Sequence, residues 1–147
     1  MKYDISALGN ALVDTQYMVD HDFLDEIGLE ADSMTLASAE EHSPIIDKLQ
    51  SMGVESVSDC GGSATNSLVA ASYYGSKCHH VCRVANDEDG KKYLESLQKA
   101  GVQHIGYSKE DSEMPTGKCL IFVTPDAKRT MSSMLGISAY LGSKDIN

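Results

Sequence analysis

The sequence has 147 residues, of which 41% are hydrophobic and 23% are charged, so it is long enough for one globular domain with a buried core. The formal net charge of −10 predicts that most of the surface repels nucleic acid, although a local cluster of donors is compatible with a small nucleotide and its metal ion. No tract approaches the ~20 apolar residues of a membrane span, and the start does not read as a secretory signal. We therefore expect no membrane partner, a cytoplasmic location and reduced cysteines.

The first predicted elements are strands and short helices. The run YDISALGNALVDTQYMV, residues 3–19, is typical of a buried strand that is interrupted at Gly9 and Asn10 and continues as a second strand. A short helix is predicted next, with Asp22 as its N-cap and Gly28 at its end. The segment DSMTLAS, residues 32–38, favours a strand, and a second helix is predicted to begin at Ser43.

Strands and helices alternate in the next part of the chain. The segment VESVSDC, residues 54–60, predicts a strand that leads into a helix ending near Gly75. The segment SKCHHVCRV, residues 76–84, predicts a strand, and a helix follows with Asp87 as its N-cap and Gly101 at its end. This alternation predicts a parallel α/β sheet, whereas residues 117–134 predict an antiparallel hairpin that turns at Pro125 and Asp126.

Two consecutive glycines, Gly61 and Gly62, separate a predicted strand from a predicted helix in the stretch DCGGSATNSLVAASYYG, residues 59–75. Glycines allow backbone N–H groups to approach a ligand closely, and a helix start offers unpaired N–H donors with partial positive charge. A turn that only packs a strand against a helix is the alternative. The phosphate-binding patterns G-x-x-x-x-G-K-[ST] and G-x-G-x-x-G are both absent.

Polar side chains suited to vicinal hydroxyl groups accompany this turn. Asn66 lies one helical turn after the glycines, and the first strand supplies Asn10 and Asp14 in the segment GNALVD. Each of these residues alone would more often cap a turn than bind a ligand.

In combination, these segments resemble the PfkB, or ribokinase-like, family of carbohydrate kinases. GGSATN resembles the amino-terminal glycine signature of that family, and GNALVD resembles its first-strand substrate motif. The resemblance continues through RVANDEDGKKYLESLQKAGV, residues 83–102, and through PTGKCLIFVTPDAKRTM, residues 115–131. The segments GNALVD, SMTL and PTG are most similar to the adenosine kinase branch. The implied fold is a ribokinase-like α/β domain, with a central mostly parallel sheet flanked by helices and a small β-rich lid.

The resemblance also implies a function, which is ATP-dependent phosphorylation of a primary hydroxyl on a sugar or nucleoside with Mg²⁺. Asp14 would accept hydrogen bonds from ribose-type hydroxyls, and Asn66 would hold the same ring. The remaining implied contacts are the backbone of Gly61, Gly62 and Ser63 and the pocket-lining residues Asn10 and Leu12. Cys119, Met131 and Ser133 align with lid positions that face a nucleobase, although simple packing of the lid is an equal alternative.

The resemblance divides the chain into an α/β core, expected at residues 1–14, 54–114 and 136–147, and a β-rich lid, expected at residues 15–37 and 115–135. Residues 38–53 are expected as a connecting helix. The exposed edges of the lid would either pair with a second subunit, giving a homodimer, or move as a hinged flap.

Two clusters of metal-binding residue types are better explained without a metal. Cys78, His80 and Cys82 would share one strand face at spacings of ~6.6 Å, which is too wide for one tetrahedral zinc ion without other ligands. The segment DEDG, residues 87–90, lacks the alternating ligands of a calcium loop.

The second family signature, D-T-x-G-A-G-D, does not occur in this sequence. The catalytic base and most of the ATP site belong to that signature and its surroundings, so we expect no catalytic residue in this chain and interpret it as an amino-terminal portion. A non-catalytic sugar- or nucleoside-binding module, or an oligomerising half-domain, is the alternative function.

Overall fold

The computed structural model describes residues 2–107 and 113–146 and divides the chain into two compact units. Unit 1 comprises Met1–Val13, Asp59–Gly117 and Leu135–Asn147, and unit 2 comprises Asp14–Ser58 and Lys118–Met134. Residues 38–53, expected as a connector, fall in unit 2. The helices are α1 (His21–Glu26), α2 (Ala39–Ser51), α3 (Ser63–Tyr73) and α4 (Glu88–Lys99), with short 3₁₀ segments η1 (Gly136–Tyr140) and η2 (Ser143–Asp145). The strands are β1 (Ile5–Leu8), β2 (Leu12–Met18), β3 (Met34–Leu36), β4 (Ser56–Gly61), β5 (Cys78–Val84), β6 (Gln103–Tyr107), β7 (Gly117–Val123) and β8 (Arg129–Met134).

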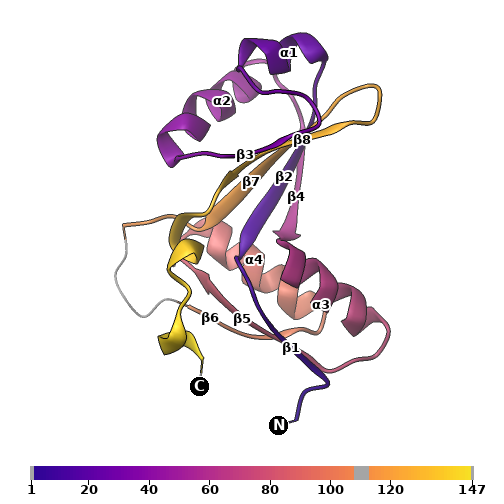
Figure 1. The fold of residues 1–147 in the computed structure, drawn as a ribbon, viewed down its shortest axis with the longest axis vertical. Coiled ribbons are helices and arrows are strands. Elements are labelled where there is room, and N and C mark those ends of the chain that lie inside the picture. The colour runs from indigo at the N-terminus through magenta and orange to yellow at the C-terminus, as the bar shows by residue number, and fades with distance from the viewer. Residues whose placement is uncertain (1, 108–112, 147) are drawn as a thin grey trace. The chain divides into compact units, whose positions relative to one another are not determined.

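Unit 1 is built on a parallel sheet with the strand order β1-β5-β6 (Figure 1). Ala7 of β1 pairs with His80 of β5, which in turn pairs with His104 of β6. Successive parallel strands require a crossover, and here α3 and α4 lie in those crossovers. The parallel α/β arrangement predicted from the sequence is therefore confirmed. Strand β6 was not predicted, and β4, which was expected in this core, belongs instead to the second sheet.

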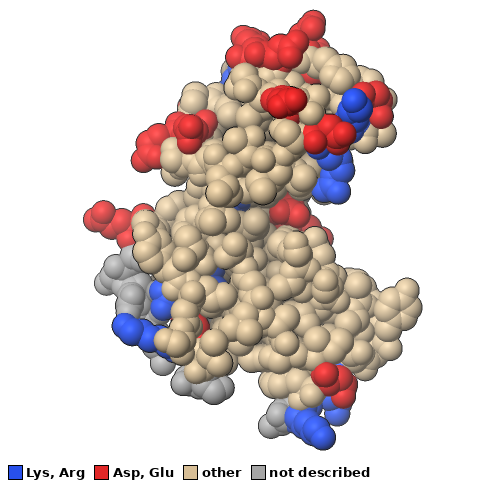
Figure 2. All heavy atoms as spheres, in the orientation of Figure 1, with Lys and Arg blue, Asp and Glu red and all other residues tan. Residues whose placement is uncertain are grey.

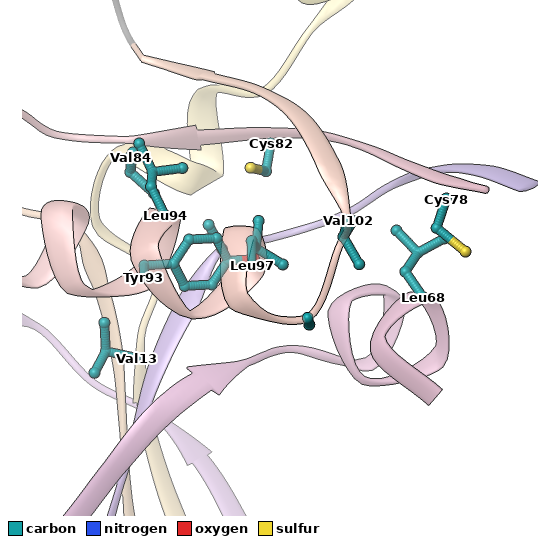
Figure 3. Packing of buried hydrophobic residues seen from close by; sticks show 11 residues of the cluster. Val13, Leu68, Cys78, Cys82, Val84, Tyr93, Leu94, Leu97 and Val102 are labelled. Atoms are coloured by element: carbon teal, nitrogen blue, oxygen red, sulfur yellow. The ribbon is translucent and has the colours of Figure 1, made fainter. Parts of the chain in front are cut away.

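The core of unit 1 forms where α3 and α4 pack on one face of this sheet (Figure 3). Tyr93, Leu94 and Leu97 of α4 lie toward Cys82 and Val84 of β5, as the helical spacing predicted. Burial of each such large side chain contributes about 1.5–3 kcal/mol, so these contacts fix α4 on the sheet.

The strands of unit 2 belong to a mixed sheet with the order β3-β8-β7-β2-β4. β7 and β8 form the predicted antiparallel hairpin, whereas β3 pairs with β8 in parallel. Helices α1 and α2 cover one face, where a second apolar cluster is buried. Its buried members are Tyr17, Phe23, Leu24, Leu49, Leu120 and Phe122.

Two helix starts differ from the sequence prediction. The N-cap of α1 is Asp20, whose carboxylate accepts a hydrogen bond from the Phe23 N–H at 2.8 Å, so the prediction of Asp22 is wrong. Asp22 instead lies in the first turn, where its charge complements the helix dipole. Gly28, with φ of 71°, does end this helix as predicted.

The N-cap of helix α2 is Ser38, five residues before the predicted start at Ser43, and the helix begins at Ala39. Ser38 and Glu41 form a capping box, in which each side chain bonds the backbone N–H of the other residue. Pro44 consequently lies inside the helix rather than in its first turn. The two satisfied donors of the capping box offset the hydrogen bond that proline cannot donate.

Two further observations concern the cysteines and the length of the helices. Cys60, Cys78, Cys82 and Cys119 form no disulfide bond in the structure. No helix in residues 2–107 or 113–146 combines the length and the apolar character that crossing a membrane requires.

Buried histidine side chains are a feature of both units. His80 of β5 is fully buried, and this burial, with smaller contributions from His104 and His79, lowers its pKa to about 4. Burial likewise lowers the pKa of His42 and of His104. These imidazoles are therefore neutral in the folded protein at neutral pH.

The neutral state of His80 predicts a pH-dependent stability. Between pH 6.5 and about 4 the unfolded chain binds a proton that folded His80 does not, so stability is complete above this window and falls as the pH decreases. The loss from His80 reaches about 3 kcal/mol at most. Urea unfolding at pH 7.5 and 5.0 should show a smaller pH effect in His80→Asn than in wild type. Equal pH effects in wild type and His80→Asn would contradict this assignment.

Candidate functional site

The glycine turn and the first-strand motif meet inside unit 1. A Cβ atom placed on Gly62 would lie 2.5 Å from the Asn10 carbonyl oxygen, and one placed on Gly9 would lie 2.6 Å from the Ala64 Cβ. Gly62 also has φ of 98°, a conformation that side chains disfavour. Both glycines are therefore required by the close approach of two backbone segments.

The start of α3 presents exposed polar groups at this turn. Gly62 is the N-cap and provides no side-chain hydrogen bond, and the first turn contains no acidic residue. The Asn66 N–H donates to the Gly62 carbonyl at 2.9 Å, which closes the first turn and leaves the Ser63 and Asn66 side chains exposed. This helix start can therefore donate hydrogen bonds to an oxygen-rich ligand.

The PTG segment, residues 115–117, is held at the same corner of unit 1. A Cβ atom on Gly117 would lie 2.6 Å from Leu12 Cδ2 and 2.7 Å from the Ala11 carbonyl oxygen. The Ile137 N–H donates to the Pro115 carbonyl at 2.9 Å. Asn10 is exposed and Leu12 is half-buried beside this junction. Unit 1 thus brings together six of the predicted site residues: Asn10, Leu12, Gly61, Gly62, Ser63 and Asn66.

Unit 2 places the other four predicted residues on a single sheet face. Cys119 pairs with Ser133 across β7 and β8, and Met131 is two residues from Ser133, so all three side chains share one face. Asp14 alternates with Val13 and Thr15, which are buried, and its charge acts on the Cys119 thiol. The face opposite to α1 and α2 therefore carries Asp14, Cys119, Met131 and Ser133.

Cys119 is the buried residue at the centre of this face. Burial raises the pKa of its thiol, and the charge of Asp14 acts in the same direction. The Ser133 hydroxyl donates to Cys119 Sγ at 3.3 Å and opposes that shift. The thiol therefore stays protonated at neutral pH, so Cys119 packs as an apolar side chain rather than acting as a nucleophile.

The same face carries apolar residues that were not predicted as site residues. Met34 and Leu36 of β3 pair with Met131 and Ser133, so they share this face, and they are 59% and 63% exposed. Ile121 pairs with Met131 from the other side. Strand alternation in SMTL and KCLIF was the sequence signal for these residues, but their face becomes evident only with the pairing partners.

The charge of the chain is concentrated in unit 2. This unit contains 12 of the 22 acidic residues and 4 of the 12 basic residues, which gives it a formal net charge of −8. Figure 2 shows these carboxylates crowded over the part that contains α1 and α2. An anionic ligand is therefore disfavoured near unit 2 relative to a neutral one.

Residues 2–107 and 113–146 contain no group of three or more His, Cys, Asp or Glu side chains that could hold a metal ion.

A parallel α/β sheet with a glycine turn before α3, accompanied by a β-sheet unit with one helix-covered face, defines a ribokinase-like α/β protein. The structure superposes on a probable sugar kinase from Rhizobium etli CFN 42 with a TM-score of 0.87 and 27% identity, over 99% of this chain and 42% of that chain. It also matches adenosine kinase from Sinorhizobium meliloti with a TM-score of 0.83 and 30% identity, over 100% of this chain and 43% of that chain.

The sequence comparisons agree with the fold. The pfkB family carbohydrate kinase profile matches residues 33–146. The chain is 28% identical over 137 residues to adenosine kinase 1 of Arabidopsis thaliana, which covers 90% of this chain and 38% of that protein. The chain therefore belongs to the pfkB family of carbohydrate kinases, and it spans about two fifths of the length of these relatives.

Proposed function

We propose that this chain supplies the acceptor-binding part of an ATP-dependent kinase that phosphorylates a primary hydroxyl of a nucleoside. The family assignment supports the kinase class, and several of the related proteins are adenosine kinases. ATP and Mg²⁺ are the proposed cofactors, and when bound they supply the phosphoryl group and neutralise its developing charge. Both are proposed to bind mainly through residues that this chain does not contain.

The observation that carries the choice of acceptor is the composition of the sheet face of unit 2 opposite to α1 and α2. A carboxylate, Asp14, lies on the same face as Met131, Met34 and Leu36. A charged acceptor suits ribose hydroxyls, and polarizable methionine side chains suit the flat apolar surface of a base. A free sugar would leave this apolar surface without a partner, so a nucleoside fits better than ribose.

The charge of unit 2 favours an acceptor that carries no phosphate. With a formal net charge of −8, this unit repels a nucleotide or sugar phosphate more than a neutral nucleoside. The hydroxyl-rich ring would also accept and donate hydrogen bonds at Asn66 and at the backbone of Gly61, Gly62 and Ser63.

Unit 2 would act as the lid over the acceptor, where exclusion of water prevents transfer of the phosphoryl group to water. The proposed contacts from the lid are Cys119, Met131 and Ser133. Homodimerisation through this unit and a cytoplasmic location remain predictions from the family resemblance.

Replacement of Asp14 by alanine tests this proposal. Hydrogen bonds to a charged acceptor contribute ~1.5–3 kcal/mol, so Asp14→Ala should weaken adenosine binding about ten- to hundredfold. Titration calorimetry with adenosine and with ribose measures the change, and wild type should bind adenosine more tightly. Asp47→Ala, at an exposed position of α2, is the matched control. Unchanged affinity in Asp14→Ala, or no binding of either ligand by wild type at millimolar concentration, would contradict the proposal.

A further inference from the structure

The start of α3 lacks the side-chain cap that usually holds a helix terminus in place. Its N-cap, Gly62, has no side-chain oxygen that could accept from the first-turn N–H groups. Those donors remain available to a ligand, but the turn must then be held by other contacts. In the described first turn, Thr65 is the side chain that is fully buried.

A chain of buried polar groups runs from Thr65 into unit 1. The Thr65 hydroxyl lies 2.7 Å from the Tyr93 hydroxyl of α4, which lies 3.5 Å from Nδ1 of His80 on β5. Thr65, Tyr93 and His80 are all 0–1% exposed. Tyr93 also hydrogen-bonds the Cys82 thiol. One hydroxyl group therefore links α3, α4 and the central strand of the sheet.

Thr65 and His80, the two ends of this row of polar groups, lie directly behind the candidate site. Thr65 Oγ1 would be 3.5 Å from a Cβ atom on Gly62, and His80 Nε2 would be 3.7 Å from a Cβ atom on Gly9. His80 Nε2 is buried and has no hydrogen-bond partner among the described residues. The row of polar groups formed by Thr65, Tyr93 and His80 thus lies against the two backbone segments that carry Asn10 and the glycine turn.

We propose that Tyr93 is a positioning residue that holds the first turn of α3 at the spacing needed to bind the oxygens of the acceptor. This inference rests on the proposed function, because it assumes that the N–H groups of this turn contact the ligand. Without the Tyr93 hydroxyl, the Thr65 hydroxyl loses its buried partner, and the turn gains freedom that ligand binding must then remove. Tyr93 itself is fully buried and touches no ligand.

A purely structural role of Tyr93 would lower global stability without a local effect at α3. The two roles can be separated with Tyr93→Phe, which removes one oxygen atom and keeps the ring in the core. Tyr17→Phe in the second apolar cluster is the matched control. Thr65→Val removes the Thr65 hydroxyl, which is the other partner of the Thr65–Tyr93 contact, whereas Thr65→Ser keeps a hydroxyl at this position.

Amide hydrogen exchange of the ligand-free 147-residue protein and calorimetric titration with adenosine form the test. We expect exchange at residues 63–66 to become about tenfold faster in Tyr93→Phe and Thr65→Val, but not in Tyr17→Phe or Thr65→Ser. Adenosine affinity should fall about five- to tenfold in the first two variants only.

Each outcome decides between the alternatives. Unchanged exchange at residues 63–66, or a uniform increase over all of unit 1, overturns the positioning role. Faster local exchange with unchanged adenosine affinity also overturns it, because the turn would then not contact the acceptor. If wild type binds no adenosine but Tyr93→Phe still loosens this turn selectively, the nucleoside proposal fails, whereas the placement of the turn by Tyr93 is supported.

Discussion

Replacement of Asp87 by alanine should lower the free energy of unfolding by about 3–5 kcal/mol, which is a large share of the stability of a domain of this size. The Asp87 carboxylate caps α4 by accepting the Gly90 N–H at 2.7 Å. It also accepts the N–H of Thr116 at 2.8 Å and the hydroxyl of Thr116 at 2.6 Å. Each hydrogen bond to a charged group contributes ~1.5–3 kcal/mol, but the three share one carboxylate and are not additive.

The free energy of unfolding should fall by more in Asp87→Ala than it does when an ordinary helix cap is removed, because Asp87 joins two distant segments. Thr116 Oγ1 accepts the Ala85 N–H at 2.9 Å, so removal of the carboxylate also releases the PTG segment. Asp20→Ala, which removes the single cap bond of α1, is the control and should cost about 1 kcal/mol. Equal losses in Asp87→Ala and Asp20→Ala in urea unfolding at pH 7 would show that the link to Thr116 contributes nothing.

The contribution of Asp87 should also disappear in acid. Burial would raise its pKa, but hydrogen bonds from Thr116 and Gly90 outweigh burial and lower the pKa below 3.8. A carboxyl group with a lowered folded-state pKa stabilises the protein above its unfolded value and loses that contribution as the pH falls through the folded value. The difference in the free energy of unfolding between wild type and Asp87→Ala should therefore have its full value at pH 7 and shrink as the pH falls below 3.8.

Local sequence patterns predicted the elements of this fold better than their ends. The Tyr93, Leu94 and Leu97 spacing identified α4, and Gly101, with φ of 75°, ends it. The start of α2 was missed because Pro44 favoured a first-turn position, whereas the capping box of Ser38 and Glu41 decides the start. Two competing local signals were present, and the one that satisfies more backbone donors determines the structure.

Non-local pairing accounts for the features that the sequence did not reveal. β6 is a short polar strand whose pairing with β5 depends on residues more than twenty positions away. Met34 and Leu36 share the face of Met131 and Ser133 in unit 2 because β3 pairs with β8, almost a hundred residues later. The glycine and asparagine motifs were recognisable in sequence, but the buried Thr65, Tyr93 and His80 chain behind them requires three elements to be placed together.

This 147-residue chain should not consume ATP in the presence of adenosine, ribose or fructose. Phosphoryl transfer requires a base within ~2.6–3.2 Å of the attacking hydroxyl, with a pKa near the working pH, and donors for the charge that develops on the phosphoryl oxygens. The carboxyl groups of Glu40, Asp87, Asp126 and Asp145 all have a pKa that is shifted downward. They are thereby poorer bases than an ordinary carboxylate.

Asp14, His42 and His80 are also unsuited to act as the base. Asp14 is proposed to bind ring hydroxyls, and its use as the base would leave the ring without its charged acceptor. His80 and His42 are buried and neutral, so neither can reach an attacking hydroxyl. A coupled assay of ADP release, with the related Sinorhizobium meliloti adenosine kinase as the active control, measures the result. Turnover by this chain at ordinary enzyme rates, about 1–1000 per second, would show that a base and phosphate donors are present in it and that its role is not limited to acceptor binding.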